Sequence, residues 1–304
     1  MSKVINDRDD AALVPRRAWV NGREQAVVGI GDRGLLYGDG LFETIAVRQQ
    51  APCRWSAHLA RLDRGADRLG IPRADPVLLR AEADALVAGI DHGVLRLTLT
   101  RGEGGRGYRP PIAPCPTRIL ALYASPSTRP ATELPAGTSN QGAISSKGVE
   151  LTVCRTRLGD NPQLAGIKHL NRLEQVLARA EWQDPGIIDG VMTDSRGFAV
   201  CGTMTNLFLV HDDGLVTPAL TRCGVEGTIR ELVFERCRAL NIPLVERDIQ
   251  VAELYQARGL FVTNALLGLL PVARLGAKRY ALDAVPAALV EQVRHVAFEP
   301  ETQT

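Results

Sequence analysis

The sequence predicts an α+β protein built from two domains. Apolar residues at both strand and helix spacing occur in each half of the chain, and a stretch without periodicity separates the halves. A length of 304 residues, with 45% hydrophobic and 23% charged residues, is enough for one large or two ordinary domains with buried cores. We assign residues 16–124 to a small N-terminal domain, 125–137 to a linker and 138–304 to a larger C-terminal domain.

The two segments outside these domains have distinctive compositions. Residues 1–15 mix charged and small residues without an apolar run, which predicts a disordered leader. Residues 125–137 contain three prolines and no periodicity, which is typical of a linker.

The predicted N-terminal domain begins with a hairpin, because Asn21 and Gly22 favour a tight turn between residues 18–20 and 25–28. Apolar residues at helical spacing follow a predicted Ser56 cap and indicate a helix to residue 69. The further elements expected in this half are strands at 40–47, 94–100 and 117–124 and a second helix at 75–90.

The predicted C-terminal domain alternates short strands with three helices. The strands are expected at 149–154, 190–192, 206–210, 215–216, 243–246 and 260–262, and the helices at 169–182, 228–240 and 287–297. Strands and helices in both halves support the α+β class.

Composition argues against several classes of partner. The 36 basic and 34 acidic residues leave a net charge of +2, which is too balanced for a nucleic-acid-binding or polybasic membrane surface. There is no apolar run of about 18 residues to span a membrane. Six scattered cysteines without a C-x-x-C pair favour a reducing cytoplasm, and neither they nor the five histidines show metal-ligand spacing.

Lysine is scarce, and one of the four lysines has an unusual setting. Lys168 follows the apolar segment 164–167 and precedes a predicted helix, whereas the other three lie in polar stretches. Partial burial and the positive end of a helix dipole would both favour the neutral amine that Schiff-base chemistry needs. The alternative is a surface lysine whose stem covers apolar side chains.

Two glycine-containing segments are candidate anion sites. Residues 222–230 place two glycines in a turn before a helix, where backbone N–H groups can bind a phosphate, although a plain tight loop has the same pattern. Residues 100–108 contain four glycines and two arginines after a strand. Their guanidinium groups suit an anionic substrate, and a mobile surface loop is the alternative.

Taken together, these segments resemble the fold-type IV pyridoxal-phosphate enzymes, the class IV aminotransferase family, over residues 19–272. The matching motifs occur in the family's order, at 32–34, 37–44, 58–62, 101–108, 164–175, 205–208, 223–230 and 263–265. The long segment around Lys168 and the loop that ends at Tyr108 favour the lyase branch, which eliminates pyruvate from 4-amino-4-deoxychorismate, over the branched-chain and D-amino-acid transaminase branches.

The resemblance implies a fold like that of D-amino-acid aminotransferase, with pyridoxal 5'-phosphate in the crevice between two domains, and a homodimer. It implies that Lys168 carries the cofactor and later acts as the general base, and that Thr44 lies near the reacting atoms. The implied phosphate ligands are Arg61, Val225, Glu226, Asn264 and Ala265, and the implied substrate-binding residues are Arg106 and Tyr108.

Cys201 departs from the family pattern. The family normally has a glutamate at this position, which pairs with the pyridine nitrogen of the cofactor. A thiol with an ordinary pKa of about 8.5 is largely neutral at pH 7 and would weaken the electron sink. Another group could do this work, the chain could be a variant of an ordinary enzyme, or it could be a catalytically impaired homologue that keeps the fold. A class IV transaminase is the alternative hypothesis for the enzymatic activity.

Overall fold

The computed structural model describes residues 14–125 and 147–301 and divides the chain into two compact units. One unit combines Met1–Pro130 with Pro300–Thr304, and the other spans Ala131–Glu299. Residues 1–13 of the predicted leader and 126–137 of the predicted linker lie outside the described residues. Among the described helices, none is long and apolar enough to cross a membrane.

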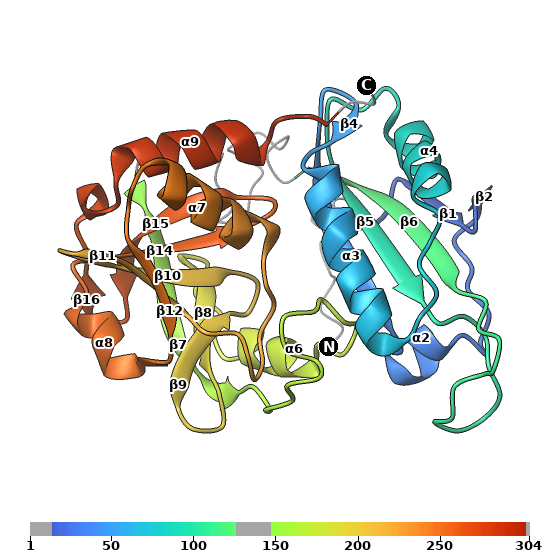
Figure 1. Ribbon diagram of the computed structural model, residues 1–304, viewed down its shortest axis with the longest axis horizontal. Helices are drawn as coiled ribbons and strands as arrows, with labels where there is room; N and C mark the ends of the chain where they lie inside the picture. The colour runs from blue at the N-terminus through green and yellow to red at the C-terminus, as the bar shows by residue number, and fades with distance from the viewer. Residues whose placement is uncertain (1–13, 126–146, 302–304) are drawn as a thin grey trace, which may run out of the picture. The chain divides into compact units, whose positions relative to one another are not determined.

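The described residues of the first unit form a six-stranded antiparallel sheet in the order β2-β1-β6-β5-β3-β4, accompanied by three helices (Figure 1). The strands are β1 (Arg17–Val20), β2 (Arg23–Glu24), β3 (Gly40–Arg48), β4 (Ala51–Pro52), β5 (His92–Thr100) and β6 (Thr117–Ala124), and the helices are α2 (Arg33–Tyr37), α3 (Trp55–Leu69) and α4 (Pro76–Val87). Helix α3 packs on β3, where leucines and an isoleucine from both elements form the core, among them Leu41, Ile45 and Leu62.

The hairpin turn is confirmed, with positive φ at Asn21 (51°) and Gly22 (77°). The second strand predicted at 25–28 is wrong, because the strand that pairs across the turn is Arg23–Glu24 and residues 25–28 form no strand. The predicted Ser56 cap is wrong, because α3 begins at Trp55 after Arg54, whose side chain makes no capping bond. The backbone N–H and the hydroxyl of Ser56 instead donate to the Glu301 carboxylate.

The end of the chain returns to the first unit. Pro300 forms a β-bridge with Cys53, and the Glu301 N–H donates to the carbonyl of Pro52 at 3.2 Å. Arg80 of α4 donates to the Glu301 carbonyl. These contacts attach the last described residues to β4, α3 and α4.

The second unit contains a ten-stranded mixed sheet in the order β12-β11-β10-β14-β15-β7-β8-β9-β13, with β16 paired to β15. The strands are β7 (Val149–Arg157), β8 (Ile187–Thr193), β9 (Phe198–Gly202), β10 (Asn206–His211), β11 (Gly214–Pro218), β12 (Leu244–Arg247), β13 (Ile249–Gln250), β14 (Gly259–Asn264), β15 (Gly268–Leu275) and β16 (Lys278–Arg279). The helices are α6 (Leu173–Arg179), α7 (Thr228–Ala239), α8 (Val251–Gln256) and α9 (Ala287–Ala297), with a 3-10 turn, η2, at Leu282–Ala284.

Helices α7 and α9 lie side by side and cover β14 and β15 (Figure 1). The core between them includes Phe208 and Phe261, whose rings stack at 4.6 Å. Both helices match the predicted ranges closely. The helix predicted at 169–182 is wrong in its first part, because α6 begins only at Leu173.

Candidate cofactor and substrate site

The segment that leads to Lys168 is bound to the turn that precedes α7. The Gly166 N–H donates to the carbonyl of Gly224 at 3.0 Å, and the Glu226 N–H donates back to the carbonyl of Gly166 at 3.0 Å. Gly166 and Val225 thereby form a parallel β-bridge. The structure therefore pairs the segment that leads to Lys168 with the turn that contains two of the predicted phosphate ligands.

Lys168 is partly buried and follows the buried residues Ala165 and Ile167. Because residues 168–172 are not helical, Lys168 does not stand at a helix N-terminus, and the predicted contribution of a helix dipole to its amine is wrong. The burial that favours a neutral amine remains. Burial also acts on the neighbouring His169, whose pKa is lowered to about 4 by its own burial and by the positive charges of Arg172 and Lys168.

The turn before α7 is shaped by Asn206 at the start of β10. The Asn206 side-chain amide donates to the carbonyl of Val225 at 2.8 Å. A Cβ on Gly227 would lie 2.1 Å from Oδ1 of Asn206, so a larger residue at this position would displace the Asn206 amide. Gly227 caps α7 without a side-chain bond, which leaves the first backbone N–H groups of the helix available to an anion.

Two buried hydroxyl groups flank this turn. Thr228 is the first residue of α7, and Thr263 pairs with Asn206 across β14 and β10. Their Oγ1 atoms are buried and have no hydrogen-bond partner among the described residues. Because buried hydroxyl groups are normally bonded, the two groups fit a phosphate that completes their bonding. Sequence patterns did not single out either threonine.

Asn264 and Ala265 follow Thr263 at the end of β14. Oδ1 of Asn264 accepts from the N–H groups of Leu266 and Leu267, at 3.0 and 2.8 Å, and closes a tight turn around Ala265. This turn lies one residue beyond the unpartnered Thr263 hydroxyl. The residues of the second unit thus fit the phosphate of pyridoxal phosphate.

Arg61 belongs to the first unit, where its guanidinium bonds to the buried carboxylate of Glu43. Its Nε lies 2.8 Å from Oε1, a second N–H group reaches Oε2, and Nδ1 of His58 lies 2.6 Å from Oε2. Burial alone would raise the pKa of Glu43, but Arg61 and His58 outweigh it and lower the pKa to about 2. Glu43 therefore fixes the orientation of Arg61. The signal for it in the sequence is one acidic residue within a mostly apolar strand.

Thr44 lies beside Glu43 on β3 and is directly opposite Arg96 on β5. Arg96 was not predicted; it stands over the ring of Phe42 at 4.3 Å, and burial lowers its pKa. Arg106 and Tyr108 lie in the loop after β5 and are exposed, with 85% of Tyr108 accessible. All four of these side chains belong to the first unit.

Cys201 is buried on β9, with 6% of its surface accessible. Burial and the nearby Asp189 and Cys223 raise the pKa of its thiol to about 12, against the opposing effect of Arg172. The group is therefore a neutral thiol at physiological pH. This matches the neutrality expected from an ordinary cysteine and strengthens it.

Asp189 is a carboxylate near Cys201, but its hydrogen bonds are made to other residues, so it does not replace the glutamate of the family. It is fully buried, and its oxygens accept from the Thr203 and Thr205 hydroxyls at 2.6 and 2.7 Å and from three backbone N–H groups. It holds the 203–205 turn in place. A second charged group near Cys201 is Arg172. Its Nη2 atom is buried and has no hydrogen-bond partner in the described part of the chain, so it could bond to a ligand.

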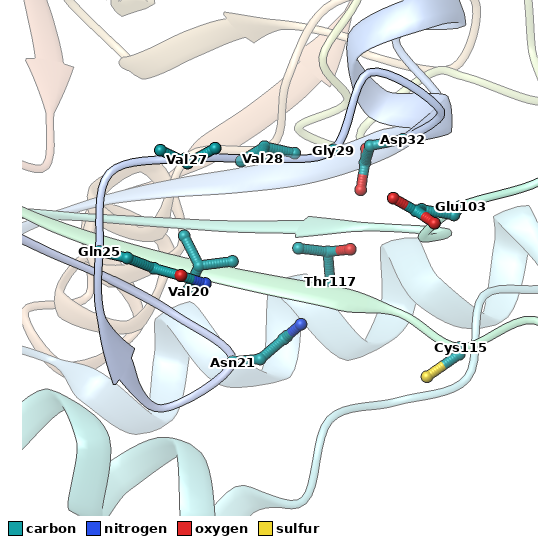
Figure 2. A pocket seen from close by; sticks show the side chains of 10 residues that line it. All are labelled: Val20, Asn21, Gln25, Val27, Val28, Gly29, Asp32, Glu103, Cys115 and Thr117. Carbon is teal, nitrogen blue, oxygen red and sulfur yellow. The ribbon is translucent and has the colours of Figure 1, made fainter.

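A cavity of about 320 Å³ opens in the first unit between the β1–β2 hairpin and the residues after β5 (Figure 2). Figure 2 shows the side chains of Asp32, Glu103 and Thr117 at one end of it. None of the predicted site residues lines this cavity. Within the described residues, no group of three or more His, Cys, Asp or Glu side chains is arranged to hold a metal ion.

A two-sheet α+β fold, in which the segment before a scarce lysine pairs with a turn that fits a phosphate group, is consistent with a pyridoxal-phosphate enzyme. The chain belongs to the class IV aminotransferase family, whose family model matches residues 40–275. The enzymes of this family depend on pyridoxal phosphate, and the chain is a pyridoxal-phosphate-dependent enzyme.

Three comparisons refine the relationship. The chain is 34% identical to the aminodeoxychorismate lyase of Vibrio harveyi, covering 87% of this chain and 93% of that protein. It is 45% identical to the 4-amino-4-deoxychorismate lyase of Pseudomonas aeruginosa, whose crystal structure matches with a TM-score of 0.80 over 91% of this chain and 97% of that one. A putative branched-chain-amino-acid aminotransferase of Methanocaldococcus jannaschii is 28% identical over 84% of this chain and 86% of its own length.

Proposed function

We propose that the chain is a 4-amino-4-deoxychorismate lyase, which eliminates pyruvate and releases 4-aminobenzoate. The observation that carries the proposal is the pairing of the Lys168 segment with the turn before α7, where two buried hydroxyls lack partners among the described residues. The two lyases that the chain resembles support the reaction over that of a transaminase.

The phosphate end of the site is assigned to the residues that the family resemblance implies. Val225, Glu226, Asn264 and Ala265 offer the two turns described above, and the hydroxyls of Thr228 and Thr263 complete the cradle. Arg61 adds a positive charge that Glu43 keeps oriented.

Pyridoxal phosphate, when bound, supplies an electron sink for the C–H bond next to the substrate amine. Lys168 would hold the cofactor, and its freed amine would remove the proton from the ring carbon that bears nitrogen. The C–O bond to the enolpyruvyl group then breaks, its methylene takes up a proton, and the group leaves as pyruvate while the ring becomes aromatic. Thr44 is the proposed proton relay to the methylene.

Cations and a phenol of the first unit are assigned to the substrate. Arg106 and Tyr108 are proposed to bind its carboxylates, and their exposure leaves them accessible to an anion. Arg96, partly desolvated and directly opposite Thr44, supports an anionic group beside the proposed relay.

In this proposal, Cys201 determines how strongly the cofactor withdraws electrons from the substrate. A neutral thiol does not keep the pyridine nitrogen protonated as a carboxylate would. Aromatisation of the product ring supplies a large driving force, which makes a weaker sink tolerable for elimination. We further propose a cytoplasmic homodimer that supplies 4-aminobenzoate for folate synthesis; the absence of disulfides among its six cysteines is consistent with the compartment.

Product analysis tests the reaction. The purified protein, loaded with pyridoxal phosphate and given aminodeoxychorismate, should form pyruvate and 4-aminobenzoate in equal amounts. Lys168→Ala should abolish product formation and the visible absorption band of the bound cofactor, whereas the exposed-lysine control Lys278→Ala should retain both.

Two other functions have specific support and distinct outcomes. The resemblance to a putative branched-chain aminotransferase supports amino transfer, which would appear as product formation that requires a keto acid. Cys201 in place of glutamate supports a catalytically impaired homologue, which would show no absorption band with added pyridoxal phosphate.

A further inference from the structure

We propose that Arg33 is a positioning residue that fixes the loop 104–109 and thereby sets where Arg106 and Tyr108 point. The inference deepens the proposed function, because it rests on the assignment of these two side chains to the substrate carboxylates. Arg33 is the first residue of α2 and is 3% exposed, so it does not itself reach solvent.

The guanidinium of Arg33 contacts the loop backbone at consecutive residues. Its Nη1 donates to the carbonyl of Gly107 at 2.9 Å, and its Nη2 donates to the carbonyl of Tyr108 at 3.0 Å. A longer contact of 3.5 Å reaches the carbonyl of Arg109. One planar group thus fixes the peptide units on both sides of Tyr108.

The third corner of the guanidinium is held by Asp39. Nε of Arg33 lies 2.8 Å from Oδ2 of Asp39, and Arg101 donates to both oxygens of the same carboxylate at 2.8 and 3.0 Å. Arg101 also donates to the carbonyls of Leu69 and Gly70 at the end of α3. The loop is therefore connected through Arg33, Asp39 and Arg101 to a long helix of the unit.

Tyr37, at the other end of α2, fixes the loop by two further contacts. The Gly107 N–H donates to the Tyr37 hydroxyl at 3.0 Å, and the rings of Tyr37 and Tyr108 meet edge to face at 5.4 Å. The Arg33 guanidinium stands 4.9 Å from the centre of the Tyr37 ring. Arg33 and Tyr37 thus form one surface against which the loop is held.

The loop needs such an anchor because of its own composition. Glycines at 104, 105 and 107 give it wide backbone freedom, and it forms no strand or helix. Arg106 and Tyr108 are exposed, so their directions depend on the backbone that carries them. Lysine at position 33 has a single ammonium group and cannot reach Asp39 and two loop carbonyls in one plane.

Arg33→Lys tests the inference, with Arg80→Lys as the matched control. Arg80 is also a buried arginine of this unit, but its partners are Asp84 and the Glu301 carbonyl. With aminodeoxychorismate, we expect Arg33→Lys to raise KM roughly tenfold or more, with a smaller change in kcat. We expect Arg80→Lys to leave both KM and kcat near those of the parent chain. Tyr37→Phe, which keeps the ring and removes the acceptor of the Gly107 N–H, should raise KM in the same direction by less.

Limited trypsin digestion provides a readout that does not depend on the reaction. The bond after Arg106 is cleavable, whereas the bond after Arg109 is protected by Pro110. We expect faster cleavage after Arg106 in Arg33→Lys than in the parent chain or in Arg80→Lys. Unchanged cleavage together with unchanged KM in Arg33→Lys overturns the inference while the lyase activity stands.

Failure of the proposed function gives a different result. If the parent chain does not form pyruvate, the kinetic comparison is lost, but accelerated cleavage in Arg33→Lys still supports loop positioning, and unchanged cleavage still overturns it. A rise in KM that Arg80→Lys reproduces also overturns it, because the effect would then come from general loosening of the unit.

Discussion

The backbones of Gly166 and Val225 run in parallel register, joined by hydrogen bonds of 3.0 Å on either side. This pairing places the segment that ends in Lys168 against the turn that opens α7. The anchoring amine and the proposed phosphate cradle therefore belong to one hydrogen-bonded element. Changes on either side of the bridge should affect cofactor binding.

Gly166→Ala should weaken cofactor binding. Gly166 has a φ of +81°, and a Cβ there would lie 3.1 Å from the Glu226 carboxyl carbon. The control is Gly197→Ala, which has a similar φ of +90° but open space around the added carbon. Both variants should lose about 1 kcal/mol of apoprotein stability from backbone strain, but only Gly166→Ala should raise the Kd for pyridoxal phosphate in a fluorescence titration. Equal Kd values for the two variants would contradict the role of the bridge.

Thr228→Val and Thr263→Val should have opposite effects on the two states of the protein. Each buried hydroxyl lacks a partner among the described residues, so its removal should leave the apoprotein equally stable or more stable by about 1 kcal/mol in urea denaturation. The same changes should raise the Kd for pyridoxal phosphate about tenfold each. Thr217→Val is the control, because the Thr217 hydroxyl donates to the carbonyl of Leu207 at 2.8 Å; it should destabilise the apoprotein and leave the Kd unchanged.

Glu43→Gln should remove an acid-sensitive part of the stability. The pKa of Glu43 is lowered from 4.5 to about 2, because Arg61 and His58 outweigh the effect of burial. A lowered pKa means that the ionised form stabilises the fold above pH 4.5 by about 3 kcal/mol, and that this contribution is lost as the pH falls towards 2. Urea denaturation at several pH values between 2 and 7 should show that the free energy of unfolding depends less steeply on pH in Glu43→Gln than in the parent chain. Glu24→Gln, at an exposed carboxylate on β2, should keep the pH dependence of the free energy of unfolding that the parent chain shows.

Cys201→Glu should change the rate of elimination by no more than about tenfold, because the product ring becomes aromatic and the reaction tolerates a weaker sink. Cys201→Ser, which is neutral and similar in size, separates the effect of charge from that of packing. Single-turnover formation of 4-aminobenzoate measures both variants. An increase of many orders of magnitude in Cys201→Glu alone would show that the parent chain is impaired by its thiol.

Thiol titration should find one reactive cysteine in the native protein. Cys115 is exposed, whereas the other five cysteines are buried and form no disulfide. Burial raises the pKa of Cys53 and Cys237 to about 11 and that of Cys154, Cys201 and Cys223 to about 12. At pH 8, an aromatic disulfide reagent should therefore release one equivalent rapidly and six in denaturant. Cys115→Ser should remove the rapid equivalent.

Much of the fold could be predicted from the sequence, because its longer elements have clear periodicity. Helices α3, α7 and α9 and strands β3, β5 and β6 lie within a few residues of their predicted ranges. The missed strands have weaker local signals: β9 has five residues, and β15 contains Pro271. Helix α6 is shorter than predicted because residues 169–172 are not helical; there the Arg172 side chain donates to the carbonyl of His169 at 2.9 Å.

The candidate site was predictable only in part, because several of its residues owe their role to burial and to contacts with residues far away in the sequence. Lys168 stood out by scarcity and setting, and the glycines before α7 marked a turn. Thr228 and Thr263 have no distinctive local pattern, since their significance lies in hydroxyls that burial leaves without partners. Arg33 is similar: its partners are backbone carbonyls about 75 residues away, which no spacing rule reveals.

The return of the chain to the first unit determines how the protein can be divided. A fragment that ends near residue 130 would lack Pro300 and Glu301, and with them the acceptors used by Ser56 and Arg80. Such a fragment would begin its α3 helix without the bond that orients Ser56. A separable version of the first unit would instead require the C-terminal residues to be spliced onto it through a short connection, or supplied as a peptide in trans.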